Sequence, residues 1–299
     1  MGDKKFLIIS LGIILAISLV SAGFWDNVKV ITGKASSKGT NVTIGLYGAS
    51  MAKVTSVSTI SAVSPTEASY RDVTFYATLY DADGVEDLND SSVSANFSRG
   101  AEYSADNLCT WTNDIDTYSA NYTCSILMWY WFDAGAWNVT VAGTDLGNLS
   151  IAQNTTTTFT YNQLKALVIS PNLLTWGSIY TGSTNQQPTN DPTKVNNTGN
   201  YNSTISLTGI DLAGEVNASK VFGVANFTAD ETDGQACASG TALVNNSAQT
   251  ITGTVANRGN LSLGTGVGQE NLYYCIPTVP SLPSQTYSTL NTSAWTIAY

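Results

Sequence analysis

Short segments in which apolar and polar residues alternate restrict the fold of this chain more than any other feature. The segment from Val73 to Tyr80 alternates and is rich in β-branched and aromatic residues, which is typical of a strand with one buried face. Similar runs at Val93 to Phe97 and Trp137 to Asp145 are separated by turn residues. Because no apolar pattern with a period of about 3.6 residues extends over a useful length, these runs predict an all-β sandwich fold.

The length and composition of the chain predict two domains. Its 299 residues suffice for two domains of ordinary size plus a leader, and only 11% of them are charged. Abundant Thr, Ser, Asn and Val favour strands and turns over surface helices. We expect a signal peptide or membrane anchor at 1–22, a linker with a short strand at 23–53, and β-sandwich domains at 54–163 and 164–299.

The N-terminus has the pattern of a secretory signal. Lys4 and Lys5 precede a largely apolar run from Phe6 to Val20, and Ala22 ends a small-residue pattern that signal peptidase accepts. A spanning helix needs about 20 residues, so the run is short for one, although an uncleaved anchor is the alternative. We therefore expect Sec-type export to the cell surface or beyond it, with membrane attachment only through this segment.

Cysteine usage agrees with export. The chain has four cysteines, an even number, which in an oxidising compartment predicts two disulfides. Three pairings are open, and local pairing of Cys109 with Cys124 and of Cys237 with Cys275 is favoured because each domain then holds its own bridge. Neither C-x-x-C nor Cys/His spacing occurs, so a zinc site is not expected.

The charge of the chain is uneven. The net charge is −10, and beyond Lys53 six basic residues face twenty acidic ones, which gives −14. Such a surface repels phosphate backbones, so we expect no nucleic-acid partner. The lysines before it lie in the linker, which is either simply solvated or rests against anionic lipid or cell-wall polymer. They are Lys29, Lys34, Lys38 and Lys53.

The residue types argue against catalysis. The sequence contains no histidine, which excludes Ser-His-Asp and Cys-His arrangements and the commonest general base at neutral pH. It contains no P-loop, Rossmann glycine pattern or HExxH motif. We therefore expect that the protein is not an enzyme.

An acidic loop is the candidate metal site. Oxygen ligands at such density can hold calcium between strands, and no other cofactor is expected. The spacing departs from an EF-hand because Gly84 comes too early. The alternative is a solvated turn with a tight bend at Asp83 and Gly84. The candidate ligands are Asp81, Asp83, Glu86, Asp87 and Asp90.

An aromatic run is the candidate ligand platform. If the run is a strand, alternate rings face opposite sides, so both faces are apolar. One face then belongs to the core, and the other is either covered by a neighbouring segment or exposed to stack against sugars or a protein. The four residues are Trp129, Tyr130, Trp131 and Phe132.

Fourteen sequons for N-linked glycosylation occur, a number that a Thr- and Asn-rich β protein also reaches by chance, but that in an exported chain indicates a glycosylated surface. They begin at Asn41, Asn89, Asn96, Asn121, Asn138, Asn148, Asn154, Asn196, Asn202, Asn217, Asn226, Asn245, Asn260 and Asn291.

Two stretches resemble a known class of domain. The segments from Phe75 to Leu88 and from Trp137 to Asn148 resemble strand-turn segments of Ig-like and PKD-like domains in prokaryotic surface proteins, especially archaeal ones. Asn197 to Asn200 and the closing Trp295 to Ile297 resemble a related surface module. The resemblance implies two tandem Ig-like β-sandwiches that act as spacers, adhesive modules or envelope components, and it implies no catalytic residue.

The expected function is therefore that of a non-catalytic cell-surface protein, a spacer, adhesion or envelope module whose partner is a surface glycan or protein. One alternative is a carbohydrate-binding adhesin that uses Trp129 to Phe132. Another is a subunit of an extracellular filament or surface layer, which self-associates when a strand at Asn41 to Ile44 adds to a neighbour's sheet edge.

Overall fold

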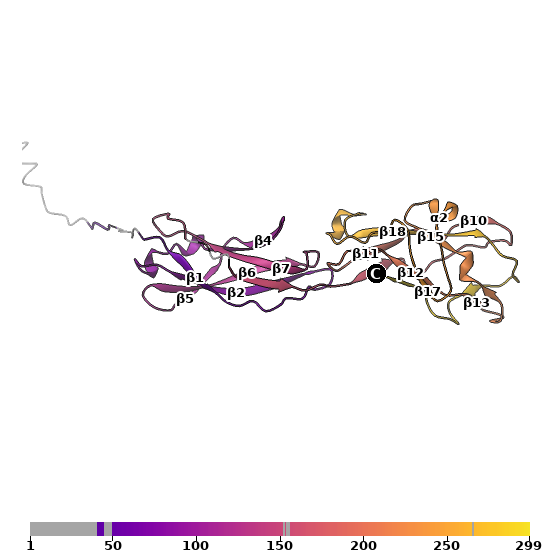
Figure 1. Cartoon of the computed structure of the whole chain (residues 1–299), viewed down its shortest axis with the longest axis horizontal. Helices are drawn as coiled ribbons and strands as arrows, with labels where there is room; N and C mark the ends of the chain where they lie inside the picture. Colours follow the sequence, from indigo (N-terminus) through magenta and orange to yellow (C-terminus); the bar gives the residue numbers. More distant parts are fainter. Residues whose placement is uncertain (1–40, 45–49, 152, 154–155, 265) are drawn as a thin grey trace, which may run out of the picture. The chain divides into compact units, whose positions relative to one another are not determined.

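The structure is a computed structural model that describes residues 41–44, 50–151, 153, 156–264 and 266–299 (Figure 1). The predicted signal or anchor segment at 1–22 lies outside these residues, as does most of the predicted linker. The chain divides into two compact units, Met1–Leu46 and Tyr47–Tyr299. In the described ranges, no helix is both long and apolar enough to cross a membrane. Residues 41–44, where a short strand was predicted, carry no regular structure.

The predicted all-β character is confirmed, since antiparallel strands dominate the described residues. We call the part from residue 50 to residue 161 the first β region. Its strands are β1 (Lys53–Val57), β2 (Tyr70–Tyr80), β3 (Ser94–Arg99), β4 (Glu102–Asp106), β5 (Thr110–Asp114), β6 (Ser119–Trp129), β7 (Gly135–Ala142) and β8 (Thr158–Tyr161), with 3-10 turns η1 (Val85–Asp87) and η2 (Asp90–Ser92).

These strands form two four-stranded antiparallel sheets, in the orders β1-β2-β6-β5 and β4-β3-β7-β8. The pair β2 and β6 is the longest, with Tyr70 opposite Trp129 at one end and Tyr80 opposite Ser119 at the other. Along β2, Val73 and every second residue after it are buried, as the alternation predicts. Strand β4 was not predicted, and of the aromatic run Trp129 to Phe132 only Trp129 lies in a strand, at the end of β6.

Both sheets contribute to a single hydrophobic cluster. Phe97 of β3 lies 5.5 Å from Phe75 of β2 and 4.6 Å from Phe159 of β8, measured between ring centroids. Trp137 is fully buried, and its indole donates a hydrogen bond to the backbone oxygen of Asp133. The core is therefore closed between the two sheets.

We call residues 167–299 the second β region, which has its own hydrophobic cluster. Its elements are β9 (Leu167–Ser170), β10 (Thr184–Gln186), β11 (Thr193–Asn197), β12 (Ser206–Gly209), β13 (Leu212–Gly214), β14 (Val221–Phe222), η3 (Val224–Asn226), β15 (Thr228–Asp230), α2 (Gln235–Ala238), β16 (Thr241–Ala242), β17 (Ser247–Thr250), η4 (Leu261–Leu263), β18 (Gln269–Thr278), β19 (Tyr287–Ser288) and β20 (Thr296–Ala298).

The second region is less regular than the first. Its largest sheet has the order β16-β15-β18-β11-β9, β10 also pairs with β18, and two three-stranded sheets, β17-β12-β20 and β14-β13-β19, complete it. The segment from Thr181 to Asn202 is polar, and it supplies β10 and β11. Pro277 lies near the end of β18, where a missing backbone donor costs little.

Both favoured disulfide pairings are confirmed. Cys109 is bonded to Cys124, which closes the hairpin of β5 and β6 within one sheet. Cys237 of α2 is bonded to Cys275 of β18, so this short α-helix is tied to the largest sheet of the second region. On the chain-entropy relation, loops of these lengths contribute about 3 and about 4 kcal/mol.

Candidate functional site

Three buried carboxylates meet at one end of the first β region. Asp81 follows β2 directly, Asp87 ends η1, and Asp145 follows β7 in the other sheet. The relative exposure of the three residues is 0%, 5% and 0%. One carboxylate oxygen from each lies within 4.8 Å of one from each of the others. Two strands of different sheets thus bring three negative groups into one buried place.

The backbone around the cluster is fixed by hydrogen bonds. The Asp83 amide donates to Asp81 Oδ1 at 2.9 Å, and the Leu149 amide donates to Asp145 Oδ1 at 2.7 Å. The Leu146 amide donates to the backbone oxygen of Asp87. The second oxygens, Oδ2 of Asp81 and Oδ2 of Asp145, are buried and accept no hydrogen bond from the described residues.

The electrostatics of the cluster follow from this burial. Burial raises the pKa of Asp81 above its ordinary value, the hydrogen bond from the Asp83 amide opposes that shift, and repulsion from Asp87, Asp83 and Asp145 adds to it. Within the described part of the chain, neither Asp81 nor Asp145 forms an ion pair. Within the described residues, no arginine or lysine therefore pairs with the carboxylates of Asp81 and Asp145.

The structure brings together two of the five predicted calcium ligands, Asp81 and Asp87. The other three serve different contacts: Asp83 accepts from the Ser50 amide, Asp90 accepts from the Tyr122 hydroxyl, and Glu86 is exposed. Gly84 adopts a φ of +111°, so the predicted tight bend at Asp83 and Gly84 is present.

Asp145 was missed as a member of the cluster. It lies far along the chain in a different sheet, and no local spacing rule connects it to the acidic loop. The one sequence signal that could have found it is its position as the last residue of the predicted strand that begins at Trp137, whereas Asp81 directly follows the predicted strand that ends at Tyr80.

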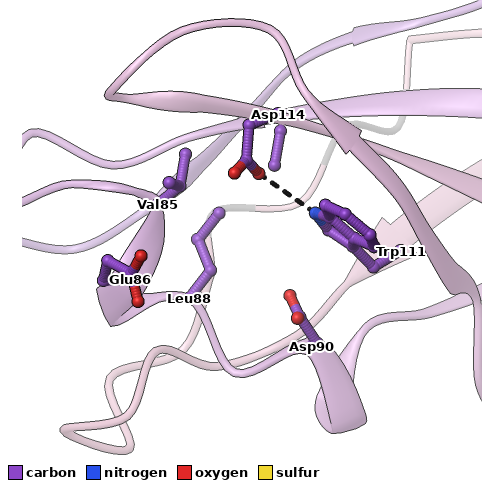
Figure 2. A pocket seen from close by; sticks show the side chains of 7 residues that line it. Val85, Glu86, Leu88, Asp90, Trp111 and Asp114 are labelled. Atoms are coloured by element: carbon purple, nitrogen blue, oxygen red, sulfur yellow. Dashed lines mark hydrogen bonds between the residues drawn. The ribbon is translucent and has the colours of Figure 1, made fainter.

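A pocket lies beside the acidic loop, as Figure 2 shows. Three carboxylates line it, from Glu86, Asp90 and Asp114, together with the half-exposed ring of Trp111. The Trp111 indole donates to Asp114 Oδ1 at 3.0 Å, so the position of this ring is fixed by another residue that lines the pocket. The Asp81 cluster is not part of this lining.

The aromatic run turns back on itself where β6 ends. Trp129 and Trp131 stack with ring centroids 4.6 Å apart, and Tyr130 is buried. Phe132 packs on the first hydrophobic cluster, while Tyr70 meets Trp129 edge to face. The two indoles are half-buried. These rings contact one another and the protein, and the platform for sugars remains a prediction.

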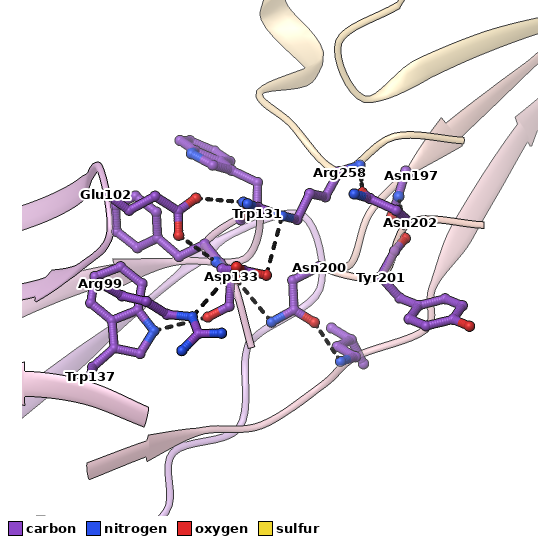
Figure 3. A network of polar contacts seen from close by, with 12 residues as sticks. Arg99, Glu102, Trp131, Asp133, Trp137, Asn197, Asn200, Tyr201, Asn202 and Arg258 are labelled. Carbon is purple, nitrogen blue, oxygen red and sulfur yellow. Dashed lines mark hydrogen bonds and ion pairs between the residues drawn. The ribbon is translucent and has the colours of Figure 1, made fainter. Parts of the chain in front are cut away.

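The end of β6 contacts the second β region through Arg258. Its guanidinium donates to Glu102 Oε1 and to the backbone oxygen of Trp131, and it lies 3.6 Å from a carboxylate oxygen of Asp133 (Figure 3). Glu102 also accepts from the Asp133 amide. The Tyr130 hydroxyl donates to the backbone oxygen of Gly259. One basic residue thus joins two carboxylates and a carbonyl of the other region.

The segment Asn197 to Asn200 forms the rest of this contact, and all four residues are buried. The Asn200 side chain donates to the backbone oxygens of Phe132 and Asn162 and accepts from the Leu164 amide (Figure 3). Thr198 donates to the Glu67 carboxylate. Nothing in the polar sequence of this segment indicated burial. We call Arg258, Asn200, Thr198 and their partners the junction network.

None of the sequon asparagines among the described residues is buried. Asn138 is exposed on β7, as glycosylation of a strand residue requires. Asn226 lies in η3 and is partly buried. Asn154 lies outside the described residues. The modification itself remains a prediction.

No family model matches the sequence, and a search of curated proteins also returned no match.

Proposed function

We propose that this chain is a non-catalytic, exported cell-surface protein whose two β regions are tandem Ig-like β-sandwich domains and act as a fixed spacer. The observation that carries the proposal is the junction network. A spacer holds what it displays at a defined place only if its domains do not move freely relative to each other. Such relative motion is the default for neighbouring domains, so a spacer needs specific contacts between them.

The chemistry of the junction network supports a fixed contact. Arg258 makes charge-assisted hydrogen bonds, which are stronger than neutral ones. Asn200 satisfies its amide group on three backbone groups, so moving the regions apart would leave buried polar atoms unpaired. Gly199 leaves no space for a side chain, because a Cβ there would lie 2.2 Å from the Leu164 oxygen. The segment between the two β regions, at Asn162 and Leu164, is thereby held against Gly199 and Asn200.

The Ig-like assignment rests on the first β region. Two antiparallel four-stranded sheets share one core with a buried tryptophan, Trp137, which is the general pattern of such sandwiches. The disulfide departs from that pattern, because Cys109 and Cys124 join neighbouring strands of one sheet rather than opposite sheets.

Export is supported by the two disulfides, which persist in oxidising compartments. The absence of histidine from the sequence supports a role without acid–base catalysis.

Labelling of intact cells tests the surface location. A membrane-impermeant amine reagent applied to the producing cells should modify the exposed Lys194 and Lys220, as detected by mass spectrometry. A cytosolic protein serves as the control and should stay unlabelled. Labelling that requires lysis, or alkylation of free thiols in the freshly isolated protein, would refute export.

Self-association by strand addition is a second candidate. Val42 and Ile44 are 75% and 81% exposed, and every residue of the edge strand β5 is exposed. An apolar, β-prone segment can add to such an edge. If the protein self-associates, its sedimentation coefficient rises with protein concentration. Replacing Val42 and Ile44 by serine should reduce that rise. A sedimentation coefficient that does not change with concentration in the parent protein would remove this candidate.

A further inference from the structure

We propose that Asp81, Asp87 and Asp145 together bind one divalent cation of the calcium class at the end of the first β region. This inference is independent of the spacer function. It differs from the site expected from the sequence, because Asp145 replaces Asp83, Glu86 and Asp90 as a ligand.

Geometry supports a shared ion. Calcium binds oxygen ligands at about 2.3 to 2.6 Å, so two oxygens on one ion are at most about 5 Å apart. The nearest oxygens of the three carboxylates lie within 4.8 Å of one another. They therefore meet the distance condition without any movement of the backbone.

The second, independent observation concerns two buried atoms. Asp81 and Asp145 are fully buried, and Oδ2 of each has no hydrogen-bond partner among the described residues. A buried carboxylate oxygen without a partner is costly, and buried charges normally are paired or coordinate a metal. Both residues hold their other oxygen on a backbone amide, which fixes the carboxylates as a preformed site.

The donor set selects the kind of ion. All three side chains offer hard oxygen atoms, and the chain has no histidine and no free cysteine to bind zinc or copper. Magnesium demands octahedral geometry and keeps several waters, which a buried cluster of three carboxylates accommodates less well than calcium does. We expect calcium to bind more tightly than magnesium.

The position of the ligands indicates what the ion does. Asp81 directly follows β2 of one sheet, Asp145 lies three residues after the end of β7 in the other, and Asp87 ends η1 in the segment that connects β2 to β3. A shared ion connects the two sheets at this end and secures the acidic loop. Binding to the folded state alone raises thermal stability by mass action.

Calorimetric titration of the chelator-treated full chain with calcium chloride tests the site. We expect one ion per chain and a dissociation constant of at most about 1 mM, the range of extracellular calcium modules. At a calcium concentration 100 times the dissociation constant, Tm should rise by about 5 to 10 °C. The absence of binding in the parent protein at about 10 mM calcium would overturn the proposal, whatever the variants do.

Three variants identify the ligands. Asp145→Asn should abolish the calcium-dependent rise in Tm. Glu86→Gln removes an exposed carboxylate of the acidic loop, Asp72→Asn removes an exposed one from β2, and both should keep the rise. Loss of binding in Glu86→Gln with retention in Asp145→Asn would refute this ligand set. If Asp145→Asn does not fold, Asp81→Asn is measured in its place, with the same two controls.

Discussion

Arg258 donates a hydrogen bond to Glu102, a residue 156 positions earlier in the chain, and the same nitrogen donates to the backbone oxygen of Trp131. Both partners belong to the first β region, and Arg258 belongs to the second. The contact is partly buried, with 24% and 23% of the two side chains exposed, so solvent screens it less than a surface pair. The stability of each β region therefore depends in part on its contact with the other.

Replacing Arg258 by alanine should destabilise the protein by about 1 to 3 kcal/mol. The change leaves the Trp131 oxygen and one oxygen of Glu102 without their charged donor. Urea unfolding measures the effect. Arg71→Ala removes an exposed arginine from β2 and should change stability by about 0.5 kcal/mol or less. Equal effects of the two changes would contradict the role of Arg258.

Replacing Gly199 by alanine should destabilise the protein by roughly 2 to 4 kcal/mol. The new Cβ would lie 2.2 Å from the Leu164 oxygen, a backbone atom that the Asn200 amide holds in place. Gly177→Ala is the matched control, because its nearest contact would be 3.9 Å from a Thr189 methyl group. Thermal unfolding of both variants checks this, and a Gly199 variant as stable as the Gly177 variant would exclude the close approach.

The two disulfides should differ in their contributions. Removing Cys237 and Cys275 opens a loop of 38 residues and should cost about 4 kcal/mol, whereas removing Cys109 and Cys124 opens a loop of 15 and should cost about 3. Double alanine variants measured by denaturant unfolding give the comparison. The reverse order would mean that loop entropy does not dominate these bridges.

The protein should become less stable as pH rises and the buried Asp191 carboxyl loses its proton. Burial, with repulsion from Asp233, raises its pKa from 3.8 to about 6, although the Tyr274 amide donates to it. The folded state therefore binds the proton more tightly than the unfolded state. The stabilisation is complete below about pH 4 and is lost as pH rises through about 6.

The shift corresponds to at most about 3 kcal/mol. Asp191→Asn should flatten the slope of unfolding free energy between pH 4 and 7 without removing it, because burial also raises the pKa of Glu270. Unfolding at a series of pH values in the parent and the variant measures the slope. An unchanged slope in the variant would show that Asp191 does not titrate in this way.

Local sequence predicted the strands that have one buried face. Alternation identified β2, and cysteine count with domain position favoured both disulfide pairings. Prediction from local sequence failed where the burial of a segment depends on residues that are distant in the chain. β11 and the segment Asn197 to Asn200 are polar, which is typical of a loop. β11 nevertheless pairs with β18 and β9, and the buried Asn200 donates to the backbone oxygens of Phe132 and Asn162.

The candidate metal site was half predicted for the same reason. Asp81 and Asp87 are close in sequence, and their density is visible by inspection. Asp145 joins them only because the segment after β7 of one sheet meets the segment after β2 of the other. Sheet pairing is a long-range property that no local pattern encodes.

Nitrogen-15 relaxation of the backbone amides in β2 and β18 tests the fixed spacer most directly. If the junction network holds, amides of both regions report a single rotational diffusion tensor for the whole of Tyr47–Tyr299. Two separate tensors, each with the shorter correlation time of a single region, would contradict a fixed junction.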